Sequence, residues 1–322
     1  MTTATVIPKT YAGAFAAILA MLFFSVNDST IKFLSDSYAL HQIVFVRSII
    51  GIVFGLVVIA PLTGGIAQLR TRRLHLHLIR GSFVVFANMM FFLGLAALPL
   101  AEAVAIFFIS PLIIATFSVL FLGERVGPRR WAAIVVGLIG VLVIVQPGTA
   151  AFQAASLFPL TAAFGYASLH IMTRHLGRTE SATALAFYIQ VTFVIAATLI
   201  GLALGHGQFA GGHGPSLEFL FRGWIWLSAA DLPLLVLVGM TSALGGFFIS
   251  YAYRASEAAI VAPFEYVAMP VAIVMGYLIF DELPGLTDWI GIALIIGGGL
   301  FLLWREAVQD RRERASATHY RR

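Results

Sequence analysis

The sequence predicts an all-α integral membrane protein, in which ten transmembrane helices form two inverted five-helix repeats around a central cavity. Three observations lead to this fold class. The 322 residues are 60% hydrophobic and 11% charged, with a mean hydropathy of +0.95, a composition unlike that of soluble domains. Apolar segments of membrane-spanning length recur along the whole chain. One segment of the first half returns in the second half with the opposite charge around it.

A membrane helix needs about 20 mainly apolar residues. Segments of this kind cover residues 11–34, 39–60, 77–97, 102–122, 130–147, 154–174, 181–204, 231–253, 258–280 and 286–304. The first is too long for the core of a signal peptide, and only Lys9 precedes it, so we expect it to be retained. We therefore predict a first repeat over residues 11–147, a second over 154–304 and a basic tail over 305–322.

The two copies of the repeated segment cover residues 101–140 and 256–298. Each has a glutamate, a tryptophan seven residues later and a glycine nine residues after that, namely Glu124, Trp131 and Gly140, then Glu282, Trp289 and Gly298. The break between the two apolar segments is basic in the first copy, with Arg125, Arg129 and Arg130. In the second copy it is acidic, with Asp281, Glu282 and Asp288. Since basic loops remain in the cytoplasm, the two copies are predicted to cross the membrane in opposite directions.

The basic residues also predict the orientation of the chain. With the N-terminus inside, all but Lys32, Arg47 and Arg222 of the 20 Lys and Arg lie at cytoplasmic ends of the spans. An even number of spans then puts both termini inside. These residues form no basic face, which argues against a nucleic-acid partner. The absence of cysteine excludes disulfides, thiolate metal sites and a cysteine nucleophile, and we predict no cofactor and no metal.

Two less regular parts of the chain are predicted to be solvated. The connection over residues 206–230 has too few histidines for a metal site, so we expect a flexible outer loop with Trp224 and Trp226 at the headgroup boundary. The charged tail after Trp304 is expected to fray against lipid. Two GxxxG pairs, Gly51 with Gly55 and Gly201 with Gly205, predict close helix packing. The same glycines could form the face of a weak homodimer. Both a monomer and a weak homodimer are open interpretations.

Ionisable residues inside the bilayer are costly and need a partner or a function. Asp28 and Lys32 lie one helical turn apart, and Arg47 in the next span is a second candidate partner for Asp28. A structural clamp between the first two helices and a contact with substrate are both open interpretations of these three residues. Asn27 and Asn88 either bond a neighbouring helix or line the cavity.

Four glutamates lie at the ends of spans. Glu102 and Glu257 begin their helices, where a carboxylate is favoured by the free amide groups. Glu124 and Glu282 end the same helices, and we expect gate or capping contacts from them.

Glu265 differs from these because it lies about 12 Å into the ninth span, with no basic residue at its depth in the second half. We predict that it binds a proton or a cationic substrate; a neutral structural glutamate is the alternative.

Three prolines, Pro111, Pro263 and Pro270, are predicted to kink the fourth and ninth helices and to shape a cavity. Aromatic and polar side chains of the second half suit a ligand with a flat or apolar part. They are Tyr166, His170, Tyr188, Tyr251, Tyr253 and Tyr266.

The stretch GLAALPLAEAVAIFFISPLIIATFSVLFLGERVGPRRWAAIVVGLIGVLVI and its second copy resemble the drug/metabolite transporter superfamily, in its ten-helix group with two EamA-type repeats. The resemblance covers nearly the whole chain, although DEL replaces the usual GE in the second copy and an insertion precedes it. It implies an inner-membrane secondary carrier whose helices one, three, four, six, eight and nine surround the substrate. Arg47 would then lie outside the cavity.

The resemblance also implies a set of cavity residues. With Tyr266 added, the candidate substrate-binding residues are Asn27, Asn88, Ser110, Tyr166, His170, Tyr251, Glu265 and Tyr266. The NDSTIK segment and the arginine in the second helix look most like members that carry S-adenosylmethionine, riboflavin or opine-type metallophores.

The predicted function is therefore the transport of a small amphipathic metabolite by alternating access, without a covalent step. The metabolite is amino-acid-like, amine, nucleoside-like or flavin-like, and a proton is the candidate coupling ion. Uptake of S-adenosylmethionine or riboflavin, a channel and a structural membrane protein are the alternatives. The chain has no HExxH or GxSxG motif, which argues against an enzyme.

Overall fold

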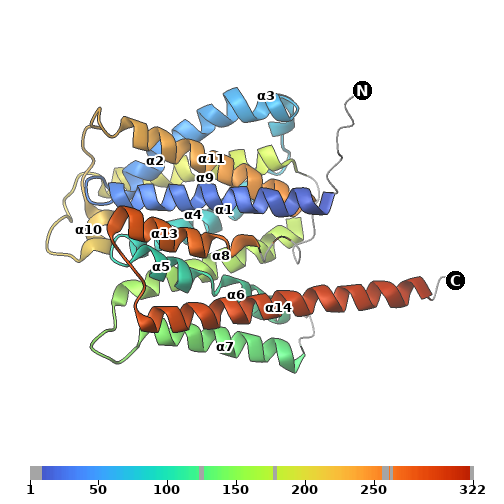
Figure 1. Cartoon of the computed structure of the whole chain (residues 1–322). Coiled ribbons are helices and arrows are strands. Elements are labelled where there is room, and N and C mark those ends of the chain that lie inside the picture. The colour runs from blue at the N-terminus through green and yellow to red at the C-terminus, as the bar shows by residue number, and fades with distance from the viewer. Residues whose placement is uncertain (1–8, 123–126, 177–179, 256–260, 262–263, 320–322) are drawn as a thin grey trace.

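The chain folds into one bundle of helices that run alongside each other (Figure 1). The computed structural model describes residues 9–122, 127–176, 180–255, 261 and 264–319, and all regular elements in these ranges are helical. Both termini leave the bundle at the same end, which we call the terminal face. The other end, which carries α10 (Pro215–Phe221), is called the opposite face.

The first half of the chain contains α1 to α7 in sequence order. Their bounds are α1 (Lys9–Leu34), α2 (Leu40–Phe54), the π-helix η1 (Gly55–Ile59), α3 (Ala60–Thr63), the 3₁₀ helix η2 (Ile66–Leu69), α4 (Leu74–Leu95), α5 (Leu100–Phe107), α6 (Ser110–Leu122) and α7 (Pro128–Val145). The second half contains η3 (Ala154–Ser156), α8 (Leu157–Leu176), α9 (Ala182–Leu204), α10, α11 (Leu232–Ala255), α13 (Ala268–Phe280) and α14 (Leu286–His319).

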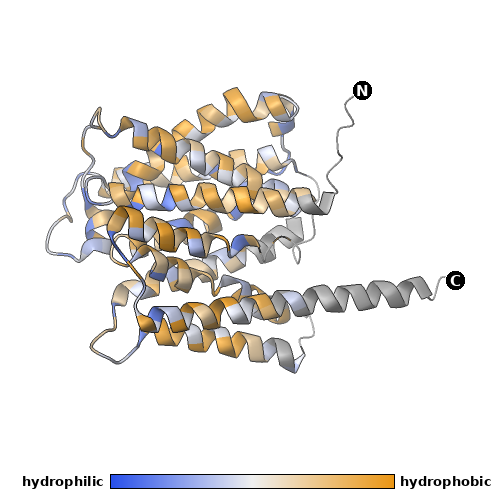
Figure 2. Ribbon diagram, in the orientation of Figure 1, coloured by the Kyte–Doolittle hydropathy of each residue, from blue (hydrophilic) through white to orange (hydrophobic). Residues whose placement is uncertain are grey.

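Most of these helices are apolar along their length (Figure 2). Within the described residues, six helical stretches are long and apolar enough to cross a membrane: Ala12–Leu34, Leu40–Thr63, Leu74–Leu95, Leu100–Phe121, Ala182–Leu204 and Leu232–Tyr253. Four shorter apolar helices accompany them, Trp131–Val145, Ala154–Leu169, Ala268–Phe280 and Leu286–Phe301. Lipid-facing helices must satisfy their own backbone groups, which explains why long apolar segments become helices here.

Two helices are broken at similar places. In the first half, Phe108 and Ile109 form a turn between α5 and α6, and Pro111 is the second residue of α6. In the second half, the turn at Tyr266 and Val267 directly follows Glu265 and precedes α13. The breaks therefore come before Pro111 and Pro270, while Pro263 lies outside the described residues.

Contacts between the two halves pair helices that run in opposite directions. A methyl group on Gly140 of α7 would lie 2.9 Å from the Gly291 carbonyl oxygen of α14, and one on Gly298 would lie 3.0 Å from the Ala133 oxygen. Residue numbers thus rise along α7 as they fall along α14. The pairing of α5 with the second broken helix follows the same rule, since Leu100 lies beside Gly276 and Phe108 beside Tyr266.

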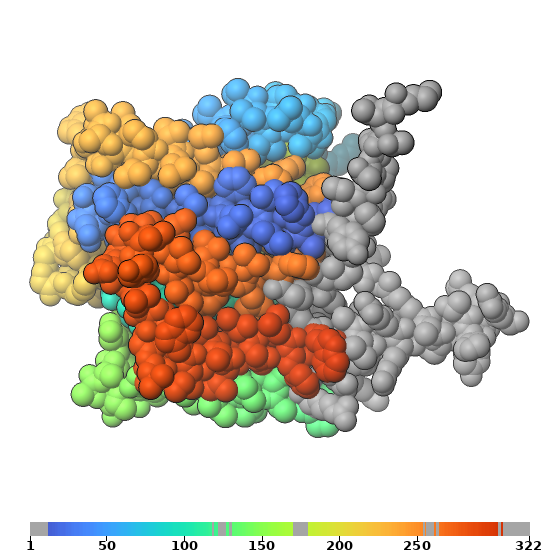
Figure 3. Space-filling view, viewed as in Figure 1, coloured from blue at the N-terminus to red at the C-terminus, as the bar shows by residue number. Residues whose placement is uncertain are grey.

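Helix α1 lies between α11 and α13 on the face seen in Figure 3. These two helices are its main contacts. Small residues allow close approach at this and other contacts. Gly51 of α2 faces Gln190 of α9 and Gly239 of α11, so this glycine of the first GxxxG pair packs within the chain.

Two predictions about the irregular parts are corrected. The later part of the connection over residues 206–230 is packed, because Trp224 covers Gly201 and Gly205 and donates a hydrogen bond to His41 of α2. The second GxxxG pair therefore contacts an indole ring instead of a helix. Residues 208–215 are exposed, as expected of an outer loop. The tail does not fray after Trp304, since α14 continues as a helix to His319.

Candidate functional site

Glu265 lies at the break of the second broken helix, where side chains from both halves of the chain meet. Its carboxylate accepts hydrogen bonds from Tyr253 of α11 and Tyr166 of α8. The ring of Phe107, the last residue of α5, lies 5.2 Å from the ring of Tyr166. These contacts hold the carboxylate at one position, as a ligand site requires. We call Glu265, Tyr166, Tyr253 and Tyr266 the Glu265 cluster.

Tyr266 brings a further polar group to this cluster. Its ring lies 5.1 Å from that of Phe108, and the residue is 6% exposed. Its hydroxyl has no hydrogen-bond partner among the described residues. The hydroxyl faces Gly299 of α14, where any side chain would overlap it. A buried hydroxyl without a partner costs about 1–3 kcal/mol, so it is a group that a polar ligand would satisfy.

A second buried polar group surrounds Arg47 of α2, which is only 1% exposed. Its two terminal nitrogens donate to the side-chain oxygens of Asn27 and Asn88, each over 3.3 Å. The guanidinium lies between two rings, 5.1 Å from the centroid of Phe92 and 4.6 Å from that of Phe193. Nε has no partner among the described residues. These five residues form the Arg47 cluster.

The side chain of Arg47 is turned away from lipid. Although α2 was expected outside the cavity helices, this side chain reaches from α2 to Asn27 of α1 and Asn88 of α4. A cation in a membrane helix is costly in lipid and almost always faces the protein interior. Asn27 is also fastened to α11, since its Nδ2 donates to the Val238 oxygen over 2.9 Å.

The sequence left Lys32 and Arg47 open as partners of Asp28. Asp28 lies within electrostatic range of Arg47. Lys32 instead forms an ion pair with Glu282, over 2.8 Å, and donates to the Leu98 oxygen over 2.6 Å. Glu282 also accepts from the Leu100 amide, over 3.1 Å. This ion pair joins α1, α5 and the end of α13 at the opposite face, which agrees with a gate or capping contact for Glu282.

A continuous path of aromatic rings joins the two clusters. Phe92 of the Arg47 cluster lies 5.9 Å from Phe91, which lies 5.1 Å from Phe107. Phe107 contacts Tyr166 of the Glu265 cluster. The bundle interior therefore has an arginine at one end, a glutamate at the other end and aromatic rings between them.

The remaining predicted residues differ in position. Ser110 is 2% exposed and begins α6 directly after the first break. Tyr251 is 42% exposed and packs against Phe247, so it points away from the cluster that contains Tyr253. The side chain of His170 and all of Glu124 and Glu257 lie outside the described residues.

Tyr253 was expected to suit a ligand but was left out of the candidate substrate-binding set, and Phe107 was not selected at all. Tyr251 and Tyr253 lie about 160° apart around α11, and the buried Ala252 lies between them. The spacing in the sequence therefore does not decide which of the two tyrosines faces the other helices. No signal in the sequence selects Phe107.

Comparison with known proteins agrees with this architecture. The sequence profile of the EamA-like transporter family matches residues 11–146 and again residues 153–304. A protein of known crystal structure superposes with a TM-score of 0.61, covering 90% of this chain and 96% of that chain. The two are 19% identical, so this likeness concerns the fold alone.

Several curated relatives are similar over most of their length. The riboflavin transporter of Vibrio cholerae is 30% identical, over 94% of this chain and 96% of its own. The S-adenosylmethionine uptake transporter of Rickettsia felis is 27% identical, over 90% and 91%. The pseudopaline exporter of Pseudomonas aeruginosa is 28% identical, over 90% and 93%.

The resemblance found in the sequence is thus confirmed, and so is the expectation that the protein is not an enzyme. The two profile matches, the full-length relatives and the apolar helices lead to one conclusion. This chain is a multi-pass membrane transporter that belongs to the EamA-like transporter family, within the drug/metabolite transporter superfamily.

Proposed function

We propose that the protein is a secondary carrier that moves a small amphipathic metabolite across the cytoplasmic membrane by alternating access. The observation that supports this most is the interior path from Arg47 to Glu265. A buried guanidinium and a buried carboxylate attract opposite ends of a polar molecule. The rings between them suit a flat or apolar middle part. A metabolite with a flat ring and polar ends fits this arrangement.

Riboflavin and S-adenosylmethionine are the two specific candidates. Both carry a flat ring system and polar groups, and full-length relatives are named as their transporters. The acidic Glu265 cluster favours a cationic group at that end of the substrate, as the sulfonium and amine of S-adenosylmethionine provide. The Tyr266 hydroxyl of this cluster suits either compound.

Alternating access is supported by the relation between the two halves. Helices that correspond in sequence run antiparallel in both contacts described above, and the family profile matches each half separately. Inverted halves provide two similar conformations that open to opposite sides. The Lys32–Glu282 ion pair fastens α1 to α5 and α13 at the opposite face, which supports a state closed at that face.

The orientation is proposed from charge. The arginine-rich segments before α4 and after Trp304 lie at the terminal face, and such segments remain in the cytoplasm. Both termini would then be cytoplasmic, and the ion pair would close the outer side. The functional unit is proposed as a monomer, because both clusters form within one chain; a weak homodimer is the alternative.

The transport proposal is tested in proteoliposomes with labelled riboflavin and labelled S-adenosylmethionine. A carrier shows counterflow, in which excess unlabelled compound inside drives accumulation of label without any imposed gradient. A channel gives only equilibration, and a structural protein gives no movement of either compound. Absence of counterflow for both compounds, and for a panel of amines and nucleosides, would reject the proposal.

The inverted topology has its own test, made simple because the chain has no cysteine. Single cysteines are placed at Gly127, before Trp131, and at Thr287, before Trp289. A membrane-impermeant maleimide applied to intact cells should label only the second. Equal labelling of both from one side contradicts opposite orientations.

A further inference from the structure

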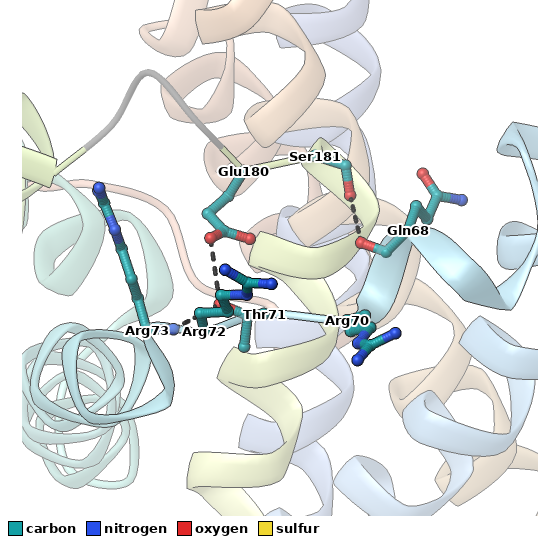
Figure 4. A pocket seen from close by; sticks show the side chains of 7 residues that line it. All are labelled: Gln68, Arg70, Thr71, Arg72, Arg73, Glu180 and Ser181. Atoms are coloured by element: carbon teal, nitrogen blue, oxygen red, sulfur yellow. Dashed lines mark hydrogen bonds between the residues drawn. The ribbon is translucent and has the colours of Figure 1, made fainter.

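A cavity of about 620 Å³ opens at the terminal face, apart from both clusters. Its wall comes from the connection between η2 and α4 and from the start of α9 (Figure 4). The lining includes three basic residues within four positions, Arg70, Arg72 and Arg73, together with Gln68, Thr71, Glu180 and Ser181. No lining residue belongs to the Arg47 or Glu265 cluster, so the cavity needs a different explanation.

The charge of this cavity is positive. Arg70 and Arg73 extend to opposite sides of the connection, with Arg72 between them (Figure 4). The acidic residue Glu180 is already engaged, because it accepts from the Thr71 hydroxyl over 3.1 Å and lies 3.5 Å from His77 Nε2. Three arginines and a single carboxylate leave this cavity with a net positive charge that attracts an anion, and the planar donors of a guanidinium match the oxygens of a phosphate.

The wall is fastened in place by hydrogen bonds to α9. The Tyr188 hydroxyl donates to the Leu69 oxygen over 2.8 Å, and the hydroxyls of Thr63 and Thr183 lie 2.9 Å apart. Ser181 caps α9 by accepting from the Ala184 amide over 2.9 Å. The backbone of the cavity wall is therefore held in place, which lowers the entropy lost when a ligand binds.

An exposed apolar surface directly precedes the arginines in the chain. Val57 is 68% exposed, Leu62 is 81% exposed and Ile66 is 61% exposed. These residues belong to η1, α3 and η2 at the edge of the bundle (Figure 1). In a membrane protein such a surface contacts acyl chains. A cationic pocket next to an acyl-chain surface has the two parts needed to hold an anionic phospholipid.

We propose that this cavity binds the phosphate headgroup of an anionic phospholipid, with the acyl chains lying along η1 and α3. The occupant supplies a phosphate oxyanion to Arg70 and Arg72 and hydrocarbon to Leu62. A free phosphate ion uses only the first of these contacts. The site does not depend on which metabolite is carried.

The test uses the full-length protein and native mass spectrometry from mixed micelles of phosphatidylglycerol and phosphatidylcholine. The wild type should retain phosphatidylglycerol in preference to phosphatidylcholine. The double variant Arg70→Gln/Arg72→Gln should lower that retention on the order of 10-fold, since each arginine near anionic lipid contributes about 1 kcal/mol. The matched control Arg311→Gln/Arg312→Gln removes the same charge from α14 and should retain phosphatidylglycerol within about twofold of the wild type.

Two further measurements separate lipid from soluble anion and from misfolding. Leu62→Gln should weaken phosphatidylglycerol retention while leaving the arginines intact, and each variant must elute as the wild type does in phosphatidylcholine nanodiscs. Inorganic phosphate at millimolar concentration should not displace the lipid. The proposal is overturned by equal retention of the two lipids, by an equal loss in the α14 control, by displacement with phosphate, or by unchanged retention in Arg70→Gln/Arg72→Gln.

Discussion

The two broken helices use the same backbone device with different chemistry. In the first half, the break at Phe108 and Ile109 is preceded by Phe107; in the second half, the break at Tyr266 and Val267 is preceded by Glu265. Both Phe107 and Glu265 contact Tyr166, the first through its ring and the second through its carboxylate. The residues after them, Phe108 and Tyr266, contact each other.

This difference indicates how a repeated fold acquires a specific site. A broken helix in each half provides the geometry, because it ends helical hydrogen bonding near the middle of the bundle. The ionisable side chain is then needed in only one of the two copies. One copy carries an apolar ring and the other a carboxylate, so Tyr166 lies between an apolar wall and a charged one.

The largest expected effect comes from Glu265→Gln, which keeps the shape of the side chain and removes its charge. We expect transport of the substrate identified by counterflow to fall by about 10- to 100-fold, because a hydrogen bond to a charged group contributes about 1.5–3 kcal/mol. If Glu265 binds the coupling proton, the variant also loses the dependence of uptake on external pH. Initial rates across a pH series measure both effects.

The matched variant is Phe107→Leu, on the other side of Tyr166. An aromatic contact contributes about 0.5–1.5 kcal/mol, so we expect a loss of about 3- to 10-fold, with the pH dependence retained. If the two variants lose the same amount and both keep the pH dependence of the wild type, the chemical distinction between the two breaks is wrong.

The substitution Gly299→Ala is expected to displace the Tyr266 hydroxyl, the group that Phe108 lacks. A methyl group at this position overlaps the Tyr266 hydroxyl, so the tyrosine has to shift. Such overpacking costs about 1–3 kcal/mol, and we expect transport to fall by about 10-fold through a higher KM.

The control is Gly297→Ala, two residues earlier in α14, where nothing lies within 4 Å of an added methyl group. We expect this variant to transport as the wild type does. Adding Tyr266→Phe to Gly299→Ala should restore part of the fold, measured by thermal stability, because the overlapping hydroxyl is gone. Equal KM values for the two alanine variants would show that the position of Tyr266 has no effect on substrate.

The two broken helices also meet at the opposite face, at the Lys32–Glu282 ion pair. Glu282 follows the end of α13 and accepts a hydrogen bond from the amide of Leu100, the first residue of α5. Breaking the ion pair therefore tests this second contact between the two helices. With side chains 12% and 30% exposed, the pair is partly screened, and we expect about 1 kcal/mol from it. Lys32→Met should raise labelling of a cysteine at Ser110 from the opposite face by about 5-fold.

Reversing both charges, with Lys32→Glu and Glu282→Lys together, should return the labelling of Ser110→Cys toward the level of the unaltered pair. Labelling that stays low in Lys32→Met would mean that the ion pair does not keep this face closed.

The fold was largely predictable, whereas the partners of buried side chains were not. A helix in lipid needs a long apolar segment, so the predicted ends agree within a few residues for α1, α4, α9 and α11. Lys32 pairs with Glu282, 250 positions away, instead of with Asp28 one turn away. Sequence spacing identifies neighbours on the same helix, but only the packing of α1 against α13 determines which acid the lysine reaches.

The site was predicted in part for the same reason. Glu265 was selected because an ionisable group at membrane depth needs a partner or a function, and Tyr166 because the resemblance implies a cavity position. Both lie with Tyr266 in the Glu265 cluster. Tyr251 and Tyr253 differ only in helical phase, which cannot be assigned to the interior without the neighbouring helices. The inward direction of the Arg47 side chain follows from the cost of a cation in lipid. The resemblance, which puts the second helix outside the cavity, does not predict the direction of this one side chain.

The smallest expected effect concerns the prolines that mark both breaks. Pro111 is the second residue of α6 and Pro270 the third of α13, positions where the first-turn amide groups have no helical acceptor. The missing proline N–H therefore costs little, and the breaks are held by contacts such as Phe108 against Tyr266. We expect Pro111→Ala and Pro270→Ala each to keep transport within about twofold of the wild type, because an exchange at the first turn changes stability by only about 0.5 kcal/mol. Initial uptake rates measure this. A loss as large as that of Glu265→Gln in either variant would mean that the prolines themselves maintain the breaks, and that the two helices depend on backbone chemistry more than on the residues beside Tyr166.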